Sequence, residues 1–593
     1  MGVPRPEYPR PQFMREEWLC LNGDWEFEID HGDTGLERGL VGRPLEGRII
    51  VPFCPESELS GIGRTDFMNA VWYRREVVVP ADWAGRRVLL HFQAVDYDTT
   101  VWIDGVEMTR HRGGFTPFTC DLGDVGGRTL SVVVRARDDH RDPKPLGKQA
   151  QRFKNYGCHY TRTTGIWQTV WMEPVPVRAH LLRSRITPDL AGGRFFLTQP
   201  IAGDRAGLAL RVTLRNGDGP LYATELPANQ DLTPVVDLPV PQESARLWSP
   251  DDPFLYRLDI ELAEDGDVLD RAESYAGLRS VTVDGKAVRI NGEAIFQRLV
   301  LDQGYYPDGI LTAPSDEALR RDIELSIAAG FNGARLHQKV FEERFLYHAD
   351  RLGYLVWGEF PDWGFDARGE AAHVCPSLAH LTQWLEVLHR DVSHPCIVGW
   401  CPLNETGQPI TDRIAPLDDL TRGLFLATKA MDPTRPALDA SGYSHRIAEI
   451  DVWDCHDYTQ DPAEFAAHHA RLADGEPFVN GPKETPWNIA CRGGPFFVSE
   501  FGGTWWNPEA AESDESWGYG DRPKTVDEFT ARFEALCGVL LDHPGMFGYC
   551  YTQLTDVFQE QNGIFFFDRR AKFDLERLRA IQTRPAAIEQ ADA

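Results

Sequence analysis

The chain has 593 residues, 42% of them hydrophobic, and a formal net charge of −29. This length exceeds what one hydrophobic core organises, so we expect about three or four domains. The negative charge disfavours nucleic acid and anionic membrane surfaces as partners, and no stretch reaches the roughly 20 apolar residues of a membrane span. The first residues hold no apolar export signal and the eleven cysteines lack Cys-x-x-Cys spacing, which predicts a cytoplasmic protein with reduced thiols.

Residues 1–176 are rich in short predicted strands. Apolar runs at 71–79, 88–92, 100–103 and 130–134 are separated by turn signals such as Asp104-Gly105. No helical period appears among them. The pattern predicts an N-terminal β-sandwich of the jelly-roll type, a fold also used by sugar-binding domains.

Residues 177–280 continue with strands at a different spacing. Apolar and polar residues alternate along 208–214 and 255–260, as in strands with one buried face. About 100 residues of such short strands are typical of an immunoglobulin-like β-sandwich.

Residues 281–593 alternate apolar runs with helical stripes. One stripe is formed by Leu319, Ile323 and Ile327, and Ser315 is its expected N-cap. Eight strand–helix units in about 310 residues predict a C-terminal (β/α)8 TIM barrel. The expected strands begin near Ile295, Asn332, Tyr354, Ile397, Ala437, Val452, Phe496 and Phe547.

Two of these apolar runs end in a glutamate. Glu405 follows the run at 397–403, and Glu500 follows the run at 495–499. They close the fourth and seventh expected strands, and a barrel enzyme carries its chemistry at this end of its strands. A pair of carboxylates at one barrel mouth is the equipment of a glycosidase, since one protonates the leaving oxygen while the other attacks the anomeric carbon.

Several short motifs occur in an order that resembles glycoside hydrolase family 2 over nearly the whole chain. This family contains β-galactosidases, β-glucuronidases and β-mannosidases. The resemblance implies that Asn404-Glu405 carries the acid/base and that Ser499-Glu500-Phe501-Gly502 carries the nucleophile. The supporting motifs are Leu21-Asn22-Gly23-Asp24-Trp25, Val71-Trp72-Tyr73-Arg74-Arg75, Thr164-Gly165-Ile166-Trp167-Gln168, Leu247-Trp248-Ser249-Pro250, Gly277-Leu278-Arg279 and Ile290-Asn291-Gly292.

The resemblance and the strand positions together predict a ring of substrate-binding residues. Asn404 is expected to hold the sugar 2-hydroxyl, and Arg335 is expected to keep Glu500 ionised. Short polar groups at other strand ends suit hydroxyls, and aromatic faces suit sugar C–H groups. The full predicted set is Asn404, Asp302, Gln303, Arg335, His337, His456, Tyr458, Trp505, Tyr551 and Gln553. Trp357, at or just past the end of its expected strand, is equally compatible with a place in the core.

The sequence departs from the family where the sugar is read. The family places His-Tyr-Pro after the second strand, but this chain has Gln338 in the His position. The Asn-x-Lys by which glucuronidases read a uronic carboxylate would fall at Glu560-Gln561-Asn562, where there is no lysine. Because Glu560 would repel a uronate, we expect a neutral glycone. Galactoside is the nominal choice, and mannoside, arabinopyranoside and a furanoside such as galactofuranoside stay open.

These patterns predict a retaining exo-β-glycosidase that acts on a carbohydrate by double displacement. A non-catalytic carbohydrate-binding protein is the alternative. A metal cluster of His337 and His456 with Glu359 or Asp302 lacks helical metal-binding spacing, so no metal is expected. No nucleotide-binding glycine motif is present, so we predict no cofactor. We expect no nucleic acid or membrane partner and leave homo-oligomerisation open.

Overall fold

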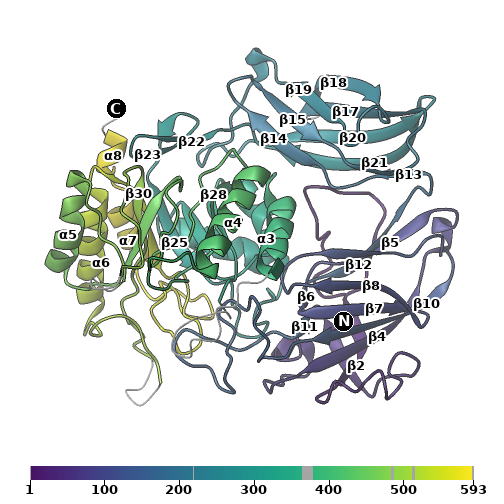
Figure 1. Ribbon diagram of the computed structural model, residues 1–593, viewed down its shortest axis with the longest axis horizontal. Coiled ribbons are helices and arrows are strands. Elements are labelled where there is room, and N and C mark those ends of the chain that lie inside the picture. Colours follow the sequence, from purple (N-terminus) through teal and green to yellow (C-terminus); the bar gives the residue numbers. More distant parts are fainter. Residues whose placement is uncertain (1, 218, 364–377, 482–485, 510–514, 591–593) are drawn as a thin grey trace.

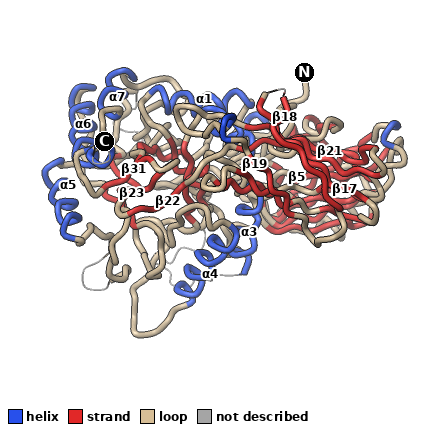
Figure 2. The backbone as a smooth tube through the Cα atoms, turned by 90° about the horizontal axis from the view of Figure 1, so that it is seen from above, coloured by secondary structure: helices blue, strands red, loops and turns tan. Residues whose placement is uncertain are grey.

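The computed structural model of the chain describes residues 2–217, 219–363, 378–481, 486–509 and 515–590. Figure 1 shows three parts, with two β-sandwiches stacked on one side and a strand-and-helix part on the other. The sequence order of the parts is sandwich, sandwich, then the strand-and-helix part. Figure 2 shows that the helices lie around the strands of the third part and that both sandwiches are almost free of helix.

The first sandwich is built from two antiparallel sheets that share one core. Trp25, Tyr73 and Val132 of one sheet pack with Leu90 and Met172 of the other, as the jelly-roll pattern requires. The four-stranded sheet has the order β1 (Leu19–Cys20), β12 (Val170–Val175), β5 (Arg87–Phe92) and β9 (Phe118–Asp121). The six-stranded sheet has the order β3 (Gly47–Val51), β2 (Gly23–Ile29), β4 (Ala70–Val78), β10 (Thr129–Arg137), β7 (Asp98–Ile103) and β8 (Val106–Arg112). The short strands β6 (Val95–Asp96) and β11 (Gly165–Ile166) pair with each other beside it.

The second sandwich has the predicted alternation of buried and exposed side chains. Leu208, Leu210, Val212 and Leu214 of β17 point into the core, and the residues between them do not. One sheet has the order β14 (Arg185–Asp189), β15 (Arg194–Thr198) and β19 (Val235–Pro239), and the other β18 (Gly219–Pro227), β17 (Leu208–Asn216), β20 (Tyr256–Glu264) and β21 (Asp267–Ala276). The strands β13 (Ala179–Leu181) and β16 (Ile201–Gly203) form a separate pair.

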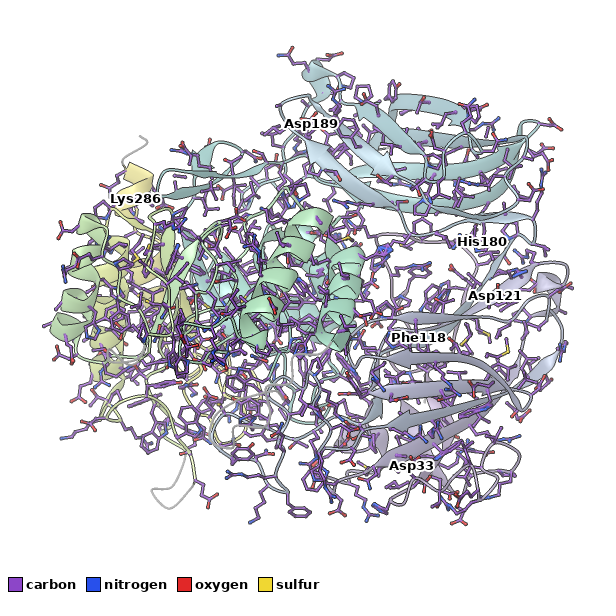
Figure 3. The ribbon with its side chains drawn as sticks, viewed as in Figure 1. Asp33, Phe118, Asp121, His180, Asp189 and Lys286 are labelled. Carbon is purple, nitrogen blue, oxygen red and sulfur yellow. The ribbon has the colours of Figure 1, made fainter. Side chains whose placement is uncertain are left out.

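A small sheet links the second sandwich to the third part. It contains β22 (Val281–Asp284), β23 (Ala287–Ile290) and β24 (Glu293–Ala294). Lys286 lies in the turn between β22 and β23 and is labelled in Figure 3.

The third part contains one seven-stranded parallel sheet. Its strands are almost entirely buried, as expected when helices cover a parallel sheet. The strand order is β28 (Ile397–Cys401), β27 (Leu355–Glu359), β26 (Gly333–Leu336), β25 (Gln297–Asp302), β31 (Met546–Thr552), β30 (Phe496–Gly502) and β29 (Trp453–Asp457). The helices are α1 (Asp316–Ala328), α2 (Glu343–Leu352), α3 (Leu378–Asp391), α4 (Pro416–Met431), α5 (Pro462–His469), α6 (Val526–Leu541), α7 (Leu575–Gln582) and α8 (Ala587–Gln590). The Ser315 side chain caps α1, as predicted.

The predicted fifth strand is present only as isolated contacts. Ala437 and Ser441 each form a parallel bridge with β28 or the residues after it. Among the described residues, this segment has no ladder with β29, and no helix follows it before β29. The described residues therefore contain seven of the eight expected strand–helix units. The missing helix is replaced by a turn around Asp439, whose carboxylate accepts hydrogen bonds from the backbone N–H of Arg446 (2.7 Å) and Ile447 (3.2 Å).

A long segment between β10 and β11 leaves the first sandwich and lies against the third part. The Leu146 N–H donates to the Trp363 carbonyl (2.6 Å), and the Gly157 carbonyl accepts from the side chains of Trp517 (2.8 Å) and Gln559 (2.7 Å). We call residues 138–164 the β10–β11 segment. It brings side chains of the N-terminal sandwich to the strand ends that carry the predicted chemistry.

A cavity of about 390 Å³ lies where the three parts meet. Leu89 of β5, His180 of β13 and His389 of α3 are among its lining residues, and Figure 3 shows His180 between the two sandwiches. None of the predicted sugar-binding residues lines this cavity. Within the described ranges, no helix combines the length and the apolar character needed to cross a bilayer.

Candidate active site

The two predicted glutamates meet at one end of the parallel sheet. Glu405 lies four residues beyond β28, and Glu500 lies within β30 rather than closing it. The pairing of β30 with β29 shifts at Ser499, so that Glu500 is opposite His456; an extra residue of this kind turns the next side chain toward a new direction. One oxygen of each carboxylate and one nitrogen of His456 all lie within 4.8 Å of one another.

Arg335 of β26 holds three of the surrounding groups. Its side chain is fully buried, and it donates from Nη1 to Glu500 Oε1 (3.2 Å) and from Nη2 to Glu359 Oε1 (3.1 Å) and Asn404 Oδ1 (3.1 Å). Burial opposes its charge, but the carboxylates of Glu359 and Glu500 raise its pKa well above the usual value. Arg335 therefore stays a cation and fixes the deeper oxygen of Glu500.

His456 of β29 connects the two glutamates. Its Nδ1 lies 2.7 Å from Glu405 Oε1 and 3.4 Å from Glu500 Oε2. Its Nε2 lies 3.0 Å from Ser441 Oγ, which donates its own proton to Asp454 Oδ2 (2.6 Å). With Glu405 ionised, both ring nitrogens act as donors and His456 is an imidazolium. Burial lowers the pKa of His456, but the charge of Glu500 and the hydrogen bond to Glu405 outweigh burial and raise it.

Tyr458 holds the second oxygen of Glu500. Its hydroxyl donates to Glu500 Oε2 (2.5 Å) and lies 3.1 Å from Thr552 Oγ1. Its ring stacks on Tyr519, with ring centroids 3.5 Å apart and planes 5° from parallel. Burial and the charge of Glu500 raise the pKa of Tyr458 well above its usual value, so the phenol remains a donor at neutral pH.

His337 and Glu359 form a buried pair beneath the two glutamates. His337 Nδ1 lies 3.0 Å from Glu359 Oε1. Burial and the positive charge of Lys148 lower the pKa of His337 well below its usual value. The imidazole is therefore neutral, with its proton on the nitrogen that faces the carboxylate, and its other nitrogen is an acceptor.

Asn404 keeps a free donor next to the glutamates. Its Oδ1 accepts from Arg335, whereas its buried Nδ2 has no hydrogen-bond partner among the described residues. Its backbone carbonyl accepts from the indole of Trp363 (2.9 Å). A fixed amide donor without a protein partner is suited to hold a substrate hydroxyl.

A second polar cluster lies beside the first and contains Gln303 and Gln553. Gln303 Nε2 donates to Gln553 Oε1 (2.5 Å) and to the Tyr160 hydroxyl (3.1 Å). Gln553 donates to Asn562 Oδ1 (2.8 Å). Glu560 accepts from Asn562 Nδ2 (3.1 Å) and from the Tyr160 hydroxyl. Tyr160 comes from the β10–β11 segment, so this cluster joins two domains.

Three residues of the predicted ring, Asp302, Tyr551 and Trp505, do not join these clusters. Asp302 has its charged neighbours at Asp322 of α1, Arg569 and Lys339, and burial raises its pKa to about 7. Tyr551 is buried against Phe533 of α6, with ring centroids 5.0 Å apart. Both side chains point outward from the sheet toward the helices, because side chains alternate along a strand. The prediction that they face the sugar is wrong in the geometry of this structure.

Trp505 and Trp357 occupy other places. Trp505 lies next to Gly518 and 5.5 Å from the Arg522 guanidinium, and it has no described contact with either glutamate. Trp357 is a core residue, fully buried and stacked on Phe497 at 5.3 Å. The structure thus places Asn404, Arg335, His337, His456 and Tyr458 around the glutamates and Gln303 and Gln553 in the second cluster. A sugar contact by Trp505 stays a prediction.

Several residues at the site were missed by reasoning from the sequence. Tyr519 carries the ring under Tyr458, Glu359 pairs with Arg335, and Tyr160 and Lys148 arrive from the first sandwich. Glu359 ends an apolar run of the same kind as Glu405, and that signal could have identified it. Nothing in the local sequence of the β10–β11 segment indicates that it reaches the barrel.

The donor atoms of Glu405, His456 and Glu500 also have the spacing of a metal site. This group differs from the considered cluster of His337, His456 and Glu359. His456 donates through both nitrogens, so it has no lone pair for a metal while it remains an imidazolium. The residues as placed do not fit a metal ion, and no step of the chemistry is assigned to one.

Comparisons with known proteins find similarity to glycosyl hydrolases. The sequence profile of the glycosyl hydrolases family 2 matches residues 186–279, within the second sandwich. A β-glucuronidase of Paenibacillus borealis is 28% identical over 468 residues, 72% of this chain and 74% of that protein. A β-galactosidase of Thermoanaerobacter pseudethanolicus is 25% identical, over 65% of this chain and 50% of that protein. The fold is that of a β-glucuronidase from Ruminococcus gnavus, with a TM-score of 0.78 over 98% of this chain and 100% of that chain, at 19% identity.

Proposed function

Because the chain belongs to glycoside hydrolase family 2 and is a β-glycosidase, we propose that it is a retaining, exo-acting enzyme that removes terminal neutral sugar residues. One observation carries the proposal. The carboxylates of Glu405 and Glu500 approach with one oxygen of each within 4.8 Å. Inverting enzymes leave room for a water molecule between carboxyl groups about 6.5–9.5 Å apart, whereas retaining enzymes hold them about 5–5.5 Å apart.

In the first step, a Glu500 oxygen attacks the anomeric carbon as the bond to the leaving oxygen breaks. The Glu405 carboxylic acid gives its proton to that oxygen, and a covalent glycosyl-enzyme forms. In the second step, Glu405 as a carboxylate takes a proton from water. The water oxygen bonds to the anomeric carbon and releases Glu500.

The surroundings of Glu500 suit the role of the nucleophile. Arg335 and Tyr458 each donate to one oxygen of Glu500, which keeps the nucleophile ionised and fixed in direction. The free Nδ2 of Asn404 is placed to donate to the sugar 2-hydroxyl. A hydrogen bond at this hydroxyl strengthens as positive charge develops at the anomeric carbon.

Exo action is supported by the β10–β11 segment. It brings Lys148 and Tyr160 of the first sandwich against the strand ends, with Tyr160 bonded to Glu560 and Lys148 5.4 Å from the centre of the Trp363 ring. A wall of this kind closes one side of the site, so it favours a pocket for a chain end over an open groove.

The identity of the glycone distinguishes two candidate functions, a neutral-sugar β-glycosidase and a β-glucuronidase. The named relatives are mostly β-glucuronidases, and the ammonium of Lys148 is a cation that a uronate could use. Glu560, however, stands in the same part of the site and balances that charge. A bound uronate would share this cation with Glu560 and face the repulsion of that carboxylate, at a cost of several kcal/mol or on the order of a thousandfold in kcat/KM.

The test is a panel of p-nitrophenyl β-glycosides with matched neutral and uronic sugars, followed by NMR of the product. We expect the best neutral sugar to exceed its uronic counterpart by about a thousandfold in kcat/KM, and the β-anomer to appear first. An α-anomer formed first would overturn retention. A glucuronide hydrolysed as well as the best neutral sugar would overturn the neutral glycone and favour a β-glucuronidase.

A further inference from the structure

Lys148 is a buried cation that no protein group in the described ranges neutralises directly. Its residue is 7% exposed, and no described residue forms a hydrogen bond or an ion pair within 4.0 Å of its Nζ. The Nζ lies 5.4 Å from the centre of the Trp363 ring. Trp363 in turn donates to the carbonyl of Asn404, so the ammonium lies on the side of the site that carries the acid/base loop.

The position of Lys148 is fixed by the backbone of the β10–β11 segment. Its carbonyl accepts from the Tyr160 N–H (2.8 Å), and the Ala150 N–H donates to the Tyr160 carbonyl (2.7 Å). The neighbouring Gly147 lies against the Gln338 carbonyl, where a side chain would clash at 2.2 Å. A close backbone contact of this kind requires glycine and anchors the base of the lysine to the barrel.

The charges that face Lys148 all belong to the site. Burial opposes its charge, but Glu560 first, and then Cys158, Glu500 and Glu405, raise its pKa. Lys148 is thus charged at neutral pH and feels Glu560 more than the other carboxylates. The two groups do not form a direct ion pair, so the Lys148 Nζ and the Glu560 carboxylate oxygens lie more than 4.0 Å apart.

Glu560 has an acceptor role that complements Lys148. One of its oxygens accepts from Asn562 and the other from the Tyr160 hydroxyl. Its carboxylate is therefore held in place by one residue of the barrel and one of the first sandwich. A fixed carboxylate with an ammonium beyond contact distance presents an acceptor and a donor to the same small region.

We propose that Lys148 is a specificity-determining residue and that, with Glu560, it reads a hydroxyl of the neutral glycone beyond C1 and C2. This inference rests on the proposed glycosidase function. A hydroxyl is both a donor and an acceptor, so it satisfies the ammonium and the carboxylate together, whereas a carboxylate substituent satisfies only the ammonium. The C1 and C2 positions are already served by Glu405, Glu500 and Asn404.

The test compares Lys148→Met with Lys154→Met. Lys154 belongs to the same segment and is exposed, so it controls for a lost charge outside the pocket. On the best neutral p-nitrophenyl glycoside, Lys148→Met should lose about 10- to 100-fold in kcat/KM, the range of a hydrogen bond to a charged group. Lys154→Met should stay within about twofold, as surface substitutions do. Equal thermal midpoints for the variants and the native enzyme show that folding is not the cause.

A series of monodeoxy glycosides then locates the hydroxyl. The substrate that lacks the hydroxyl read by Lys148 should be poor for the native enzyme. Lys148→Met should lower kcat/KM on this substrate only slightly further, because the interaction between the lysine and the hydroxyl is already absent. Glu560→Gln should show the same pattern with the same deoxy substrate. Glu560→Gln should also reduce the ratio of kcat/KM for neutral glycosides to kcat/KM for uronic glycosides.

Two results would overturn the inference while leaving the glycosidase function intact. One is a Lys148→Met enzyme that keeps its kcat/KM on neutral glycosides. The other is a loss of kcat/KM in Lys148→Met that is as large on every monodeoxy glycoside as on the parent glycoside. If the native enzyme turns over uronic glycosides only, the proposed neutral glycone fails first, and a loss with Lys148→Met would then assign Lys148 to the carboxylate. Native enzyme without turnover on any glycoside refutes the proposed function itself.

Discussion

Replacing Glu405 by alanine should separate the two proposed chemical steps, because we assign this residue a role distinct from that of Glu500. The substitution removes the carboxyl group whose Oε1 lies 2.7 Å from His456 Nδ1. It leaves Glu500 with its donors Arg335 and Tyr458 in place. The nucleophile should therefore survive intact in a site that has lost its proton donor.

The expected loss in kcat/KM follows from the proton that the Glu405 carboxyl group supplies. A general acid contributes about 10²–10⁴-fold, so substrates with poor leaving groups should lose this factor in kcat/KM. A 2,4-dinitrophenyl glycoside needs no proton in the first step and should keep its kcat/KM. Its kcat should fall, since the second step lacks a base, and a burst of dinitrophenol should precede slow turnover.

Azide gives the decisive assay. The deleted side chain leaves a space beside the His456 imidazolium, whose Nδ1–H would donate to a bound anion. Azide should enter there, attack the glycosyl-enzyme without a base and restore kcat, with a β-glycosyl azide as product. Equal losses for good and poor leaving groups, or rescue that yields an α-glycosyl azide, would refute the assignment of Glu405 and Glu500.

Three further substitutions test the surrounding groups. Arg335→Met leaves the carboxylates of Glu359 and Glu500 without their shared cation, so urea unfolding should show a loss of about 3–5 kcal/mol; an unchanged midpoint would contradict the buried network. The raised pKa of His456 means that its contribution to stability is fully present below the unfolded pKa of about 6.5 and is lost as pH rises through the folded pKa. The stability advantage of the native enzyme over His456→Asn should accordingly shrink between pH 6 and pH 9, and an advantage that grows would reverse the sign. Tyr551→Phe should keep kcat/KM within about twofold because this ring packs in the core, and a large loss would return Tyr551 to the sugar.

The strand ends of the barrel could be predicted because apolar runs with Pro or Gly at their ends mark buried parallel strands. That rule identified seven of the strands and both glutamates. It failed at the fifth position, where Asp439 gathers backbone N–H groups into a turn instead of a helix. Tertiary hydrogen bonds of this kind have no periodic signal in the sequence.

The direction of side chains required a closer count than the sequence reasoning made. In β25, Gln297 faces the barrel interior and accepts from Trp357, so Asp302, five residues later, faces outward. In β31, Cys550 has Arg335 and Glu500 as charged neighbours, so Tyr551 faces the helices. Counting in twos from one inward residue would have excluded both, whereas Lys148 depends on a domain contact that no local pattern encodes.

The surroundings of the two glutamates favour the proposed roles over the reverse assignment. Glu500 lies within a strand and is nearly buried, and both of its oxygens accept from fixed donors. These donors stabilise an anion, which the nucleophile must be at the start. Glu405 lies on a loop beyond β28, is only half-buried and has a left-handed backbone with φ of 54°. A group that gives a proton to a departing aglycone and then takes one from water must reach solvent, and only the loop position provides this access.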